Sequence, residues 1–469
     1  MSSPSFATDI WTGAGISDNW SEGENWESGT PPVSSESTLI DIPLEPQPPL
    51  IDIPITLERL SFSGTFSTGF TRFISGAQIT FSSINSTIDN SSSKGVSIGN
   101  DILIDTDSLT VTGNSSLLLE GVISGDGQLI FHSPFHSSVE LKGSNTYTGK
   151  TIVRERISLG TRGLRSIPGD MDVLGGDVNA GDQSIDTSSN ITIASGQYVP
   201  GSVVFFGSNT IGSLEVIDSN TAISVTSAAV LNIDQLSQLN ITGALYVDGT
   251  LNLNPATTLE ATGSLSGTGL INGNFTIDCP LDLSFHTSKT LAMNGDITMK
   301  ESTSFNLRRD DYIQGPSALM NISGNSFTVN EGAKIQISST VNEFIGTGEF
   351  IIIDWSQTSR STVNLDNFIL SNTDPYYSHS LRIENNRLIL SVTSLETGAD
   401  PESFDFDNTD LVMWFKGLNT AVDYKIEKSI DLEEWHWLET IESGYGPNFE
   451  FIDSEAGATG FYRLNPILE

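Results

Sequence analysis

Apolar and polar positions alternate in short runs along most of the chain, and helical periodicity is nearly absent. Each run of β-branched residues or leucines ends at a turn of Gly, Asn, Asp or Ser, a pattern typical of short β-strands. Strands are predicted at residues 109–112, 129–131, 139–141, 152–153, 203–206, 214–217, 223–226, 251–253, 275–277 and 281–283.

This series of strands keeps the same character for about 250 residues, whereas an antiparallel sandwich ends after seven to nine strands. A stack of similar turns accounts for such a series, because each turn buries its apolar face against the next one. The pattern therefore predicts an all-β protein built as a β-solenoid.

The tryptophans indicate where this stack begins and ends. Trp11, Trp20 and Trp26 lie near the start, and the next tryptophan is Trp355. The end turns of a solenoid lack one neighbour, so bulky aromatic residues are expected there as caps. We predict an N-terminal cap at residues 1–50, the solenoid at 51–398, an acidic linker at 399–410 and a small antiparallel, sandwich-like β module at 411–469.

Several segments resemble a known repeat family. Residues 145–149 read Asn-Thr-Tyr-Thr-Gly and follow a Gly-rich segment at 121–129. Together they resemble the autotransporter-associated β-strand repeat, and the segments at 11–26, 265–274 and 346–354 resemble other parts of surface proteins that carry it. Residues 424–435 and 461–464 are similar to a small β module often appended to such proteins. The resemblance implies a right-handed parallel β-helix on a Gram-negative cell surface, with an adhesive or structural role and no reaction.

Composition and charge narrow the choice of partners. The formal net charge is −37, which disfavours nucleic acid and anionic membrane surfaces. Cys279 is the only cysteine, so no intrachain disulfide can form. No segment has the length and apolarity of a membrane helix, and the first residues do not read as a signal peptide. We expect an extracellular or cell-surface protein from which the signal peptide has been removed.

Enzymes that cleave polysaccharides also use parallel β-helices, and one glycosidase arrangement on that scaffold has a fixed order of motifs. It needs Asn-Thr-Asp before Asp-Asp, then Gly-His-Gly. Here Asp310 and Asp311 precede an Asn-Thr-Asp at 372–374, and the chain has no Gly-His-Gly. The order is reversed, so Asp310 and Asp311 are more simply read as capping a strand end.

The one dense group of basic residues is the best candidate for a binding site, and we call it the basic patch. It consists of Lys150, Arg154, Arg156, Arg162 and Arg165, and no Lys or Arg occurs from 166 to 288. The patch is predicted to contact an acidic glycan or the carboxylates of a neighbouring copy, or to hold the substrate of a lyase. The alternative is that it balances nearby carboxylates of its own chain.

Two further candidates lie in the C-terminal part of the chain. Trp435 and Trp437 are two residues apart, which places both indoles on one face of a strand, where they could stack on sugar rings. The alternative is that they fill the core of the module. Carboxylate oxygens suit Ca²⁺, so Asp405, Asp407 and Asp410 are a candidate calcium site, with a solvated linker as the alternative. No other cofactor is expected.

These observations lead to one main functional hypothesis and two alternatives. The chain is predicted to be a non-catalytic secreted or cell-surface β-helix protein with a structural or adhesive role, whose partner is a cell-surface or extracellular polymer. The alternatives are a carbohydrate-binding protein, and a polysaccharide lyase or glycoside hydrolase on a β-helix scaffold.

Overall fold

The fold is described from a computed structural model of the chain. The structure describes residues 8–43, 47–65, 72–133, 135–282, 290–307, 318–330, 335–339, 348–371, 377–394, 401–407, 410–416, 423–431, 433–442, 448–453 and 461–467.

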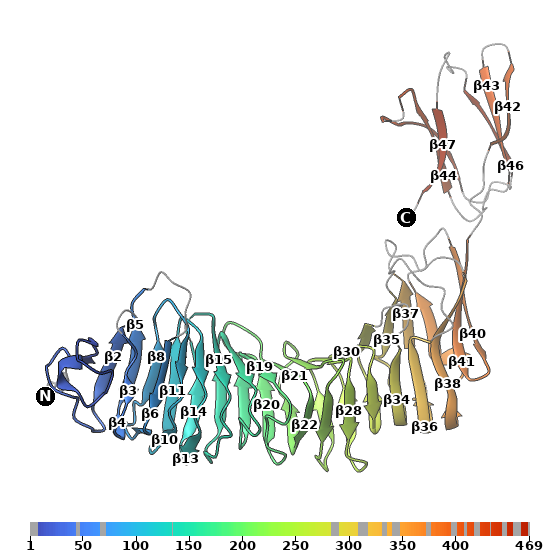
Figure 1. Ribbon diagram of the computed structural model, residues 1–469. Helices are drawn as coiled ribbons and strands as arrows, with labels where there is room; N and C mark the ends of the chain where they lie inside the picture. The colour runs from blue at the N-terminus through green and yellow to red at the C-terminus, as the bar shows by residue number, and fades with distance from the viewer. Residues whose placement is uncertain are drawn as a thin grey trace, which may run out of the picture.

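Most of the chain forms a parallel β-solenoid of about 11 turns, which confirms the predicted fold class. Hydrogen bonds between adjacent turns join residues about 20 to 23 positions apart, so this is the length of one turn. Each turn adds one strand to each of the sheets that form the sides of the solenoid, and successive turns stack along its axis (Figure 1).

Four sheets line the solenoid, and we number them by their first appearance. The first sheet contains β1 (Asp9–Ile10), β2 (Leu39–Pro43), β5 (Arg59–Ser63), β8 (Thr87–Asn90), β11 (Ser108–Gly113), β14 (Gln128–Phe131), β16 (Thr151–Arg154), β18 (Met171–Leu174), β20 (Asn190–Ala194) and β23 (Ser213–Val216). The second sheet contains β3 (Leu50–Ile51), β6 (Arg72–Gly76), β9 (Val96–Ile98), β12 (Leu117–Leu119), β15 (Ser137–Leu141), β17 (Ile157–Thr161), β19 (Asp177–Ala180), β21 (Ser202–Phe205), β24 (Ala222–Val225), β27 (Ala244–Val247), β30 (Ser264–Ser266), β33 (Pro280–Asp282), β35 (Ser304–Leu307), β37 (Ile335–Ser339) and β39 (Phe368–Ser371).

The other two sheets follow one another along the stack. The third sheet contains β4 (Ile55–Leu57), β7 (Ile79–Phe81), β10 (Ile102–Ile104) and β13 (Ile123–Gly125). The fourth sheet contains β22 (Ser208–Ile211), β25 (Val230–Ile233), β26 (Leu239–Ile241), β28 (Thr250–Leu253), β29 (Thr258–Ala261), β31 (Leu270–Asn272), β32 (Asn274–Ile277), β34 (Leu291–Met299), β36 (Met320–Val329), β38 (Gly348–Thr362), β40 (Tyr377–Glu384) and β41 (Arg387–Ser394). Two 3₁₀ turns, η1 (Gly23–Asn25) and η2 (Leu365–Asn367), complete the described elements.

The core follows directly from the alternation of apolar and polar residues. In β11, Leu109 and Val111 are buried, while Thr110 between them and Thr112 after them are only partly buried. Leu109 pairs with Leu129 of the next turn, and Val111 with Phe131, so like residues stack in rows along the axis. Inward residues at every second position thus build one continuous apolar core.

The two ends of the stack are closed in different ways. At the N-terminal end Trp11, Trp20 and Trp26 are all buried and pack edge to face. At the other end β41 pairs antiparallel with β38, and β40 antiparallel with β41. These two antiparallel strands cover the edge of the parallel sheet. An uncovered edge would expose unpaired backbone groups that could pair with another chain.

The C-terminal residues form a separate pair of antiparallel sheets. One contains β42 (Pro401–Asp407), β43 (Asp410–Lys416) and β46 (Asn448–Asp453), and the other contains β44 (Asp423–Ser429), β45 (His436–Ile441) and β47 (Phe461–Ile467). They share a small core of Leu411, Met413, Phe415, Tyr424, Ile426, Ile441 and Phe451. Residues 401–407, in the range predicted to be an irregular linker, form strand β42. Phe alternates with acidic residues in this segment, which fits a strand. The linker was predicted from the negative charge of the segment, and a charged segment can still form a strand.

In the described part of the chain, no helix has the length and apolarity that crossing a membrane requires.

Candidate functional site

The structure distributes the basic patch over two consecutive strands, with Lys150 before β16 and Arg165 after β17. Arg154 ends β16 and Arg156 lies in the turn before β17, whereas Arg162 directly follows β17. Arg156 and Arg162 are therefore about 20 Å apart along the strand at a rise of about 3.3 Å per residue. The five basic residues do not converge on one spot.

Three members of the basic patch are paired with carboxylates one turn away. Lys150 Nζ lies 3.0 Å from Asp172 Oδ2, and Arg162 Nε lies 2.8 Å from Glu140 Oε1. Arg165 forms an ion pair with Asp186. The pKa of Asp186 is lowered, first by the hydrogen bond from Ser188 and also by the charge of Arg165. These pairs support the interpretation that the patch balances carboxylates of its own chain.

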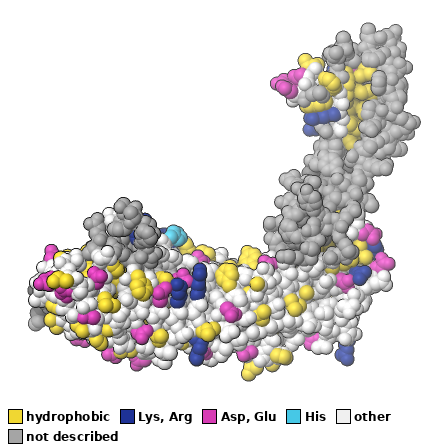
Figure 2. All heavy atoms as spheres, in the orientation of Figure 1, with side chains coloured by type: hydrophobic (Ala, Val, Ile, Leu, Met, Phe, Trp, Pro, Cys, Tyr) yellow, Lys and Arg dark blue, Asp and Glu magenta, His cyan; other side chains and the backbone are white. Residues whose placement is uncertain are grey.

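The remaining two arginines lie at the corner between the first and second sheets. Arg156 stacks on the ring of Tyr198, with its guanidinium carbon 4.9 Å from the ring centroid. Arg154 is exposed and makes no ion pair with any residue that the structure describes. Figure 2 shows one face of the molecule, on which Lys and Arg side chains are sparse and white uncharged atoms predominate.

The Asn-Thr-Tyr-Thr-Gly motif has a structural role in the stack. Asn145 is buried; its Oδ1 accepts a hydrogen bond from the backbone N–H of Ile123, and its Nδ2 donates one to the carbonyl of Ser166. Tyr147 is also buried, donates or accepts a hydrogen bond with Thr151, and has its pKa raised by burial. The motif thus joins three consecutive turns.

The candidate sugar-stacking residues differ in exposure. Trp437 is 62% exposed and lies outside the core of the C-terminal module. Trp435 is half-buried, and the guanidinium carbon of Arg463 lies 4.2 Å above its ring. Arg463 in turn pairs with Glu427 at 2.7 Å. The structure therefore leaves one indole open to a ligand and covers the other with an arginine.

The acidic candidates lie wholly or partly outside the described residues. Asp405 and Asp407 lie in β42 and Asp410 begins β43, but their side chains are outside the described residues. Asp310 and Asp311 lie outside them entirely. Among the residues that the structure does describe, no group of three His, Cys, Asp or Glu side chains is arranged to hold a metal ion.

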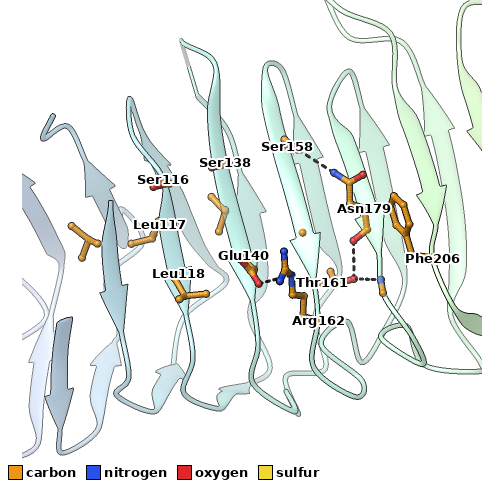
Figure 3. Close-up of a pocket in the computed structure, with 14 residues that line it drawn as sticks. Ser116, Leu117, Leu118, Ser138, Glu140, Ser158, Thr161, Arg162, Asn179 and Phe206 are labelled. Carbon is orange, nitrogen blue, oxygen red and sulfur yellow. Dashed lines mark hydrogen bonds and ion pairs between the residues drawn. The ribbon is translucent and has the colours of Figure 1, made fainter. Parts of the chain in front are cut away.

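The structure adds a site that the sequence interpretation did not contain, a groove on the outer face of the second sheet. It has a volume of about 580 Å³ and crosses β12, β15, β17 and β19 in the stacking direction (Figure 3). We call it the second-sheet groove; its lining is Val96, Ser116, Leu117, Leu118, Ser138, Val139, Glu140, Ser158, Gly160, Thr161, Arg162, Asn179, Gly181 and Phe206. An adjoining hollow of about 520 Å³ shares Ser116, Ser138 and Ser158 with it.

Register explains how this groove forms. Ser138 pairs with Ser158 on the next turn. On the preceding turn Leu117 pairs with Val139, which places Ser116 beside Ser138. The three serines therefore form a row across three turns. Gly160 pairs with Glu140 on one side and Asn179 on the other. Short outward side chains on adjacent turns leave the hollow. The sequence does indicate this groove, because Ser116, Ser138 and Ser158 each precede an apolar residue at intervals of about one turn. This regularity becomes visible only when the turns are aligned with one another.

The fold and its surface define the class: a parallel β-solenoid whose polar outer faces carry ion pairs between turns. No protein-family model, no curated protein and no solved structure matches this chain.

Proposed function

We propose that this chain is a non-catalytic secreted or cell-surface β-solenoid with a structural or adhesive role. The observation that carries the proposal is the unbroken stack of about 11 turns. At about 4.8 Å per turn it forms a rod about 50 Å long, which holds its outer faces in fixed positions for contact with other molecules. The resemblance of residues 121–153 to the repeat of bacterial surface proteins points to the same role.

The chemistry of the reactive groups also supports a role without catalysis. The thiol of Cys279 is buried, and burial raises its pKa to about 12, so it is not a nucleophile at neutral pH. The phenol of Tyr147 is buried with its pKa raised, which leaves it protonated. The cations Lys150, Arg162 and Arg165 are held by their own carboxylates and are not directed at a common substrate position.

The first prediction concerns location and adhesion. A membrane-impermeant amine reagent should label this protein on intact cells of its source, because surface lysines such as Lys142 are partly exposed. Adding the purified protein should also reduce attachment of those cells to their natural support, since it competes for the same partner. Labelling that requires lysis of the cells, together with unchanged attachment, would contradict the proposed role.

Carbohydrate binding by the C-terminal module is a second candidate function, favoured by the exposure of Trp437. An open indole beside polar groups suits the face of a sugar ring. Trp437→Ala should weaken retention on an insoluble glycan that holds the wild-type protein by about tenfold or more, as expected for a central Trp of an interface.

The control for this prediction is Trp435→Ala, whose ring is already covered by Arg463. Loss of Trp435 should affect the stability of the module more than its retention. Equal retention of the wild-type and Trp437→Ala proteins on every glycan tested would remove this second function.

A further inference from the structure

The second-sheet groove contains a glycine that the fold itself does not need. A Cβ added to Gly160 would lie 3.7 Å from Glu140 Cγ, an ordinary contact, and Gly160 does not have a positive φ. By contrast, Gly125 has φ +109°, and a Cβ there would meet the carbonyl of Ile104 at 2.1 Å. A glycine inside a strand is less favourable than alanine, because its backbone loses more conformational freedom on folding. Such a glycine often marks the close approach of a ligand.

The lining of the groove offers hydrogen bonds without a net charge. Ser116 and Ser138 are exposed, and their hydroxyls have no side-chain partner among the described residues. Asn179 Nδ2 donates to Ser158 Oγ at 3.3 Å, and its amide oxygen lies on the side away from Ser158 (Figure 3). Glu140 and Arg162 are the charged residues of the lining, and they neutralise each other at 2.8 Å.

An aromatic ring stands at one end of the groove. Phe206 is 45% exposed and follows β21 (Figure 3). On the preceding turn Ala180 pairs with Phe205, so Gly181 is the neighbour of Phe206. Gly181 has no side chain to cover that ring. Hydroxyls, an amide and an open aromatic ring together are the groups that recognise the hydroxyls and the apolar face of a sugar.

We propose that the second-sheet groove binds an extended, neutral, unbranched glycan, with its rings placed along the stacking direction. The serine row repeats at the strand spacing of about 4.8 Å, which is close to the repeat of an extended chain of pyranose rings. An acidic polymer is disfavoured because the lining has no unpaired cation and the whole chain carries −37. The inference rests on the proposed non-catalytic role, because the glycan is to be held and not cleaved.

The experiment is calorimetric titration of the full chain with neutral hexasaccharides, namely cellohexaose, mannohexaose, xylohexaose and chitohexaose, with hexagalacturonate as the acidic comparison. At least one neutral hexasaccharide should bind. Gly160→Phe fills the groove and should weaken that binding by about tenfold or more, because the ligand then loses its contacts in the hollow. The matched control is Ser224→Phe, in the same row of outward residues on β24 but outside the groove. It should bind like the wild type.

Removing polar groups provides a second variant if Gly160→Phe fails to fold. The double variant Ser138→Ala, Ser158→Ala should bind about fivefold more weakly, as expected for the loss of two neutral hydrogen bonds. Absence of neutral binding, equal affinity of Gly160→Phe and the wild type, or tighter binding of hexagalacturonate would each overturn the inference. Chromatography of the sugars after titration distinguishes the proposed non-catalytic role from the proposed binding site. If the wild type cleaves a sugar and Gly160→Phe does not, the second-sheet groove remains the binding site but the non-catalytic role is wrong.

Discussion

Asn145→Ala should destabilise the middle of the solenoid by about 2 to 4 kcal/mol, because it leaves two buried backbone groups without partners at about 1 to 3 kcal/mol each. Asn145 is 3% exposed, so water cannot replace its amide. Its Oδ1 lies 2.8 Å from the N–H of Ile123 on one turn, and its Nδ2 lies 2.7 Å from the carbonyl of Ser166 on another.

The loss should be local, because the turns of a solenoid are stabilised mainly by their nearest neighbours. Hydrogen exchange measured by mass spectrometry should show reduced protection around residues 121–127 and 163–167, and urea unfolding should begin at a lower concentration. Asn114→Ala is the matched control, since Asn114 is exposed and should change stability by less than about 0.5 kcal/mol. Equal effects of the two substitutions would show that the bridge between turns contributes little.

The strands of the solenoid could be predicted from the sequence because their period-two alternation reflects burial alone. Leu109, Leu129 and Val139 lie inside strands at the predicted positions, and each is buried. The burial of Trp11, Trp20 and Trp26 followed for a related reason, because indole rings are too large and apolar to remain exposed where the stack lacks a neighbour.

The surface chemistry could not be predicted in the same way, because it depends on which turn lies next to which. Arg162 pairs with Glu140 only because β15 and β17 are adjacent and in register. Along the sequence the basic patch looks like one cluster, yet the five residues of β17 separate its members. The groove at Gly160 is a hollow between several turns, and no single turn contains it.

Trp26→Ala should have an even larger effect than Asn145→Ala, about 3 to 5 kcal/mol, the usual cost of removing a buried Trp side chain. Trp26 is 2% exposed and lies between Trp20 and Trp11, at ring-centroid distances of 4.6 and 5.2 Å. Its Nε1 also donates a hydrogen bond of 2.8 Å to the carbonyl of Trp20. The substitution therefore opens a cavity and frees a buried carbonyl at once.

The position of this cluster determines how the effect will be observed. The first turn has a neighbour on one side only, so it should unfold before the rest of the stack once its cap is lost. Hydrogen exchange should then increase in residues 9–63 and stay unchanged beyond about residue 150, while tryptophan fluorescence shifts to the red. Trp437→Ala is the control, because its 62% exposed ring contributes little to any core. If exchange instead increased evenly along the whole solenoid, the turns would be unfolding as one cooperative unit, and the tryptophan cluster would stabilise the entire rod and not only its end.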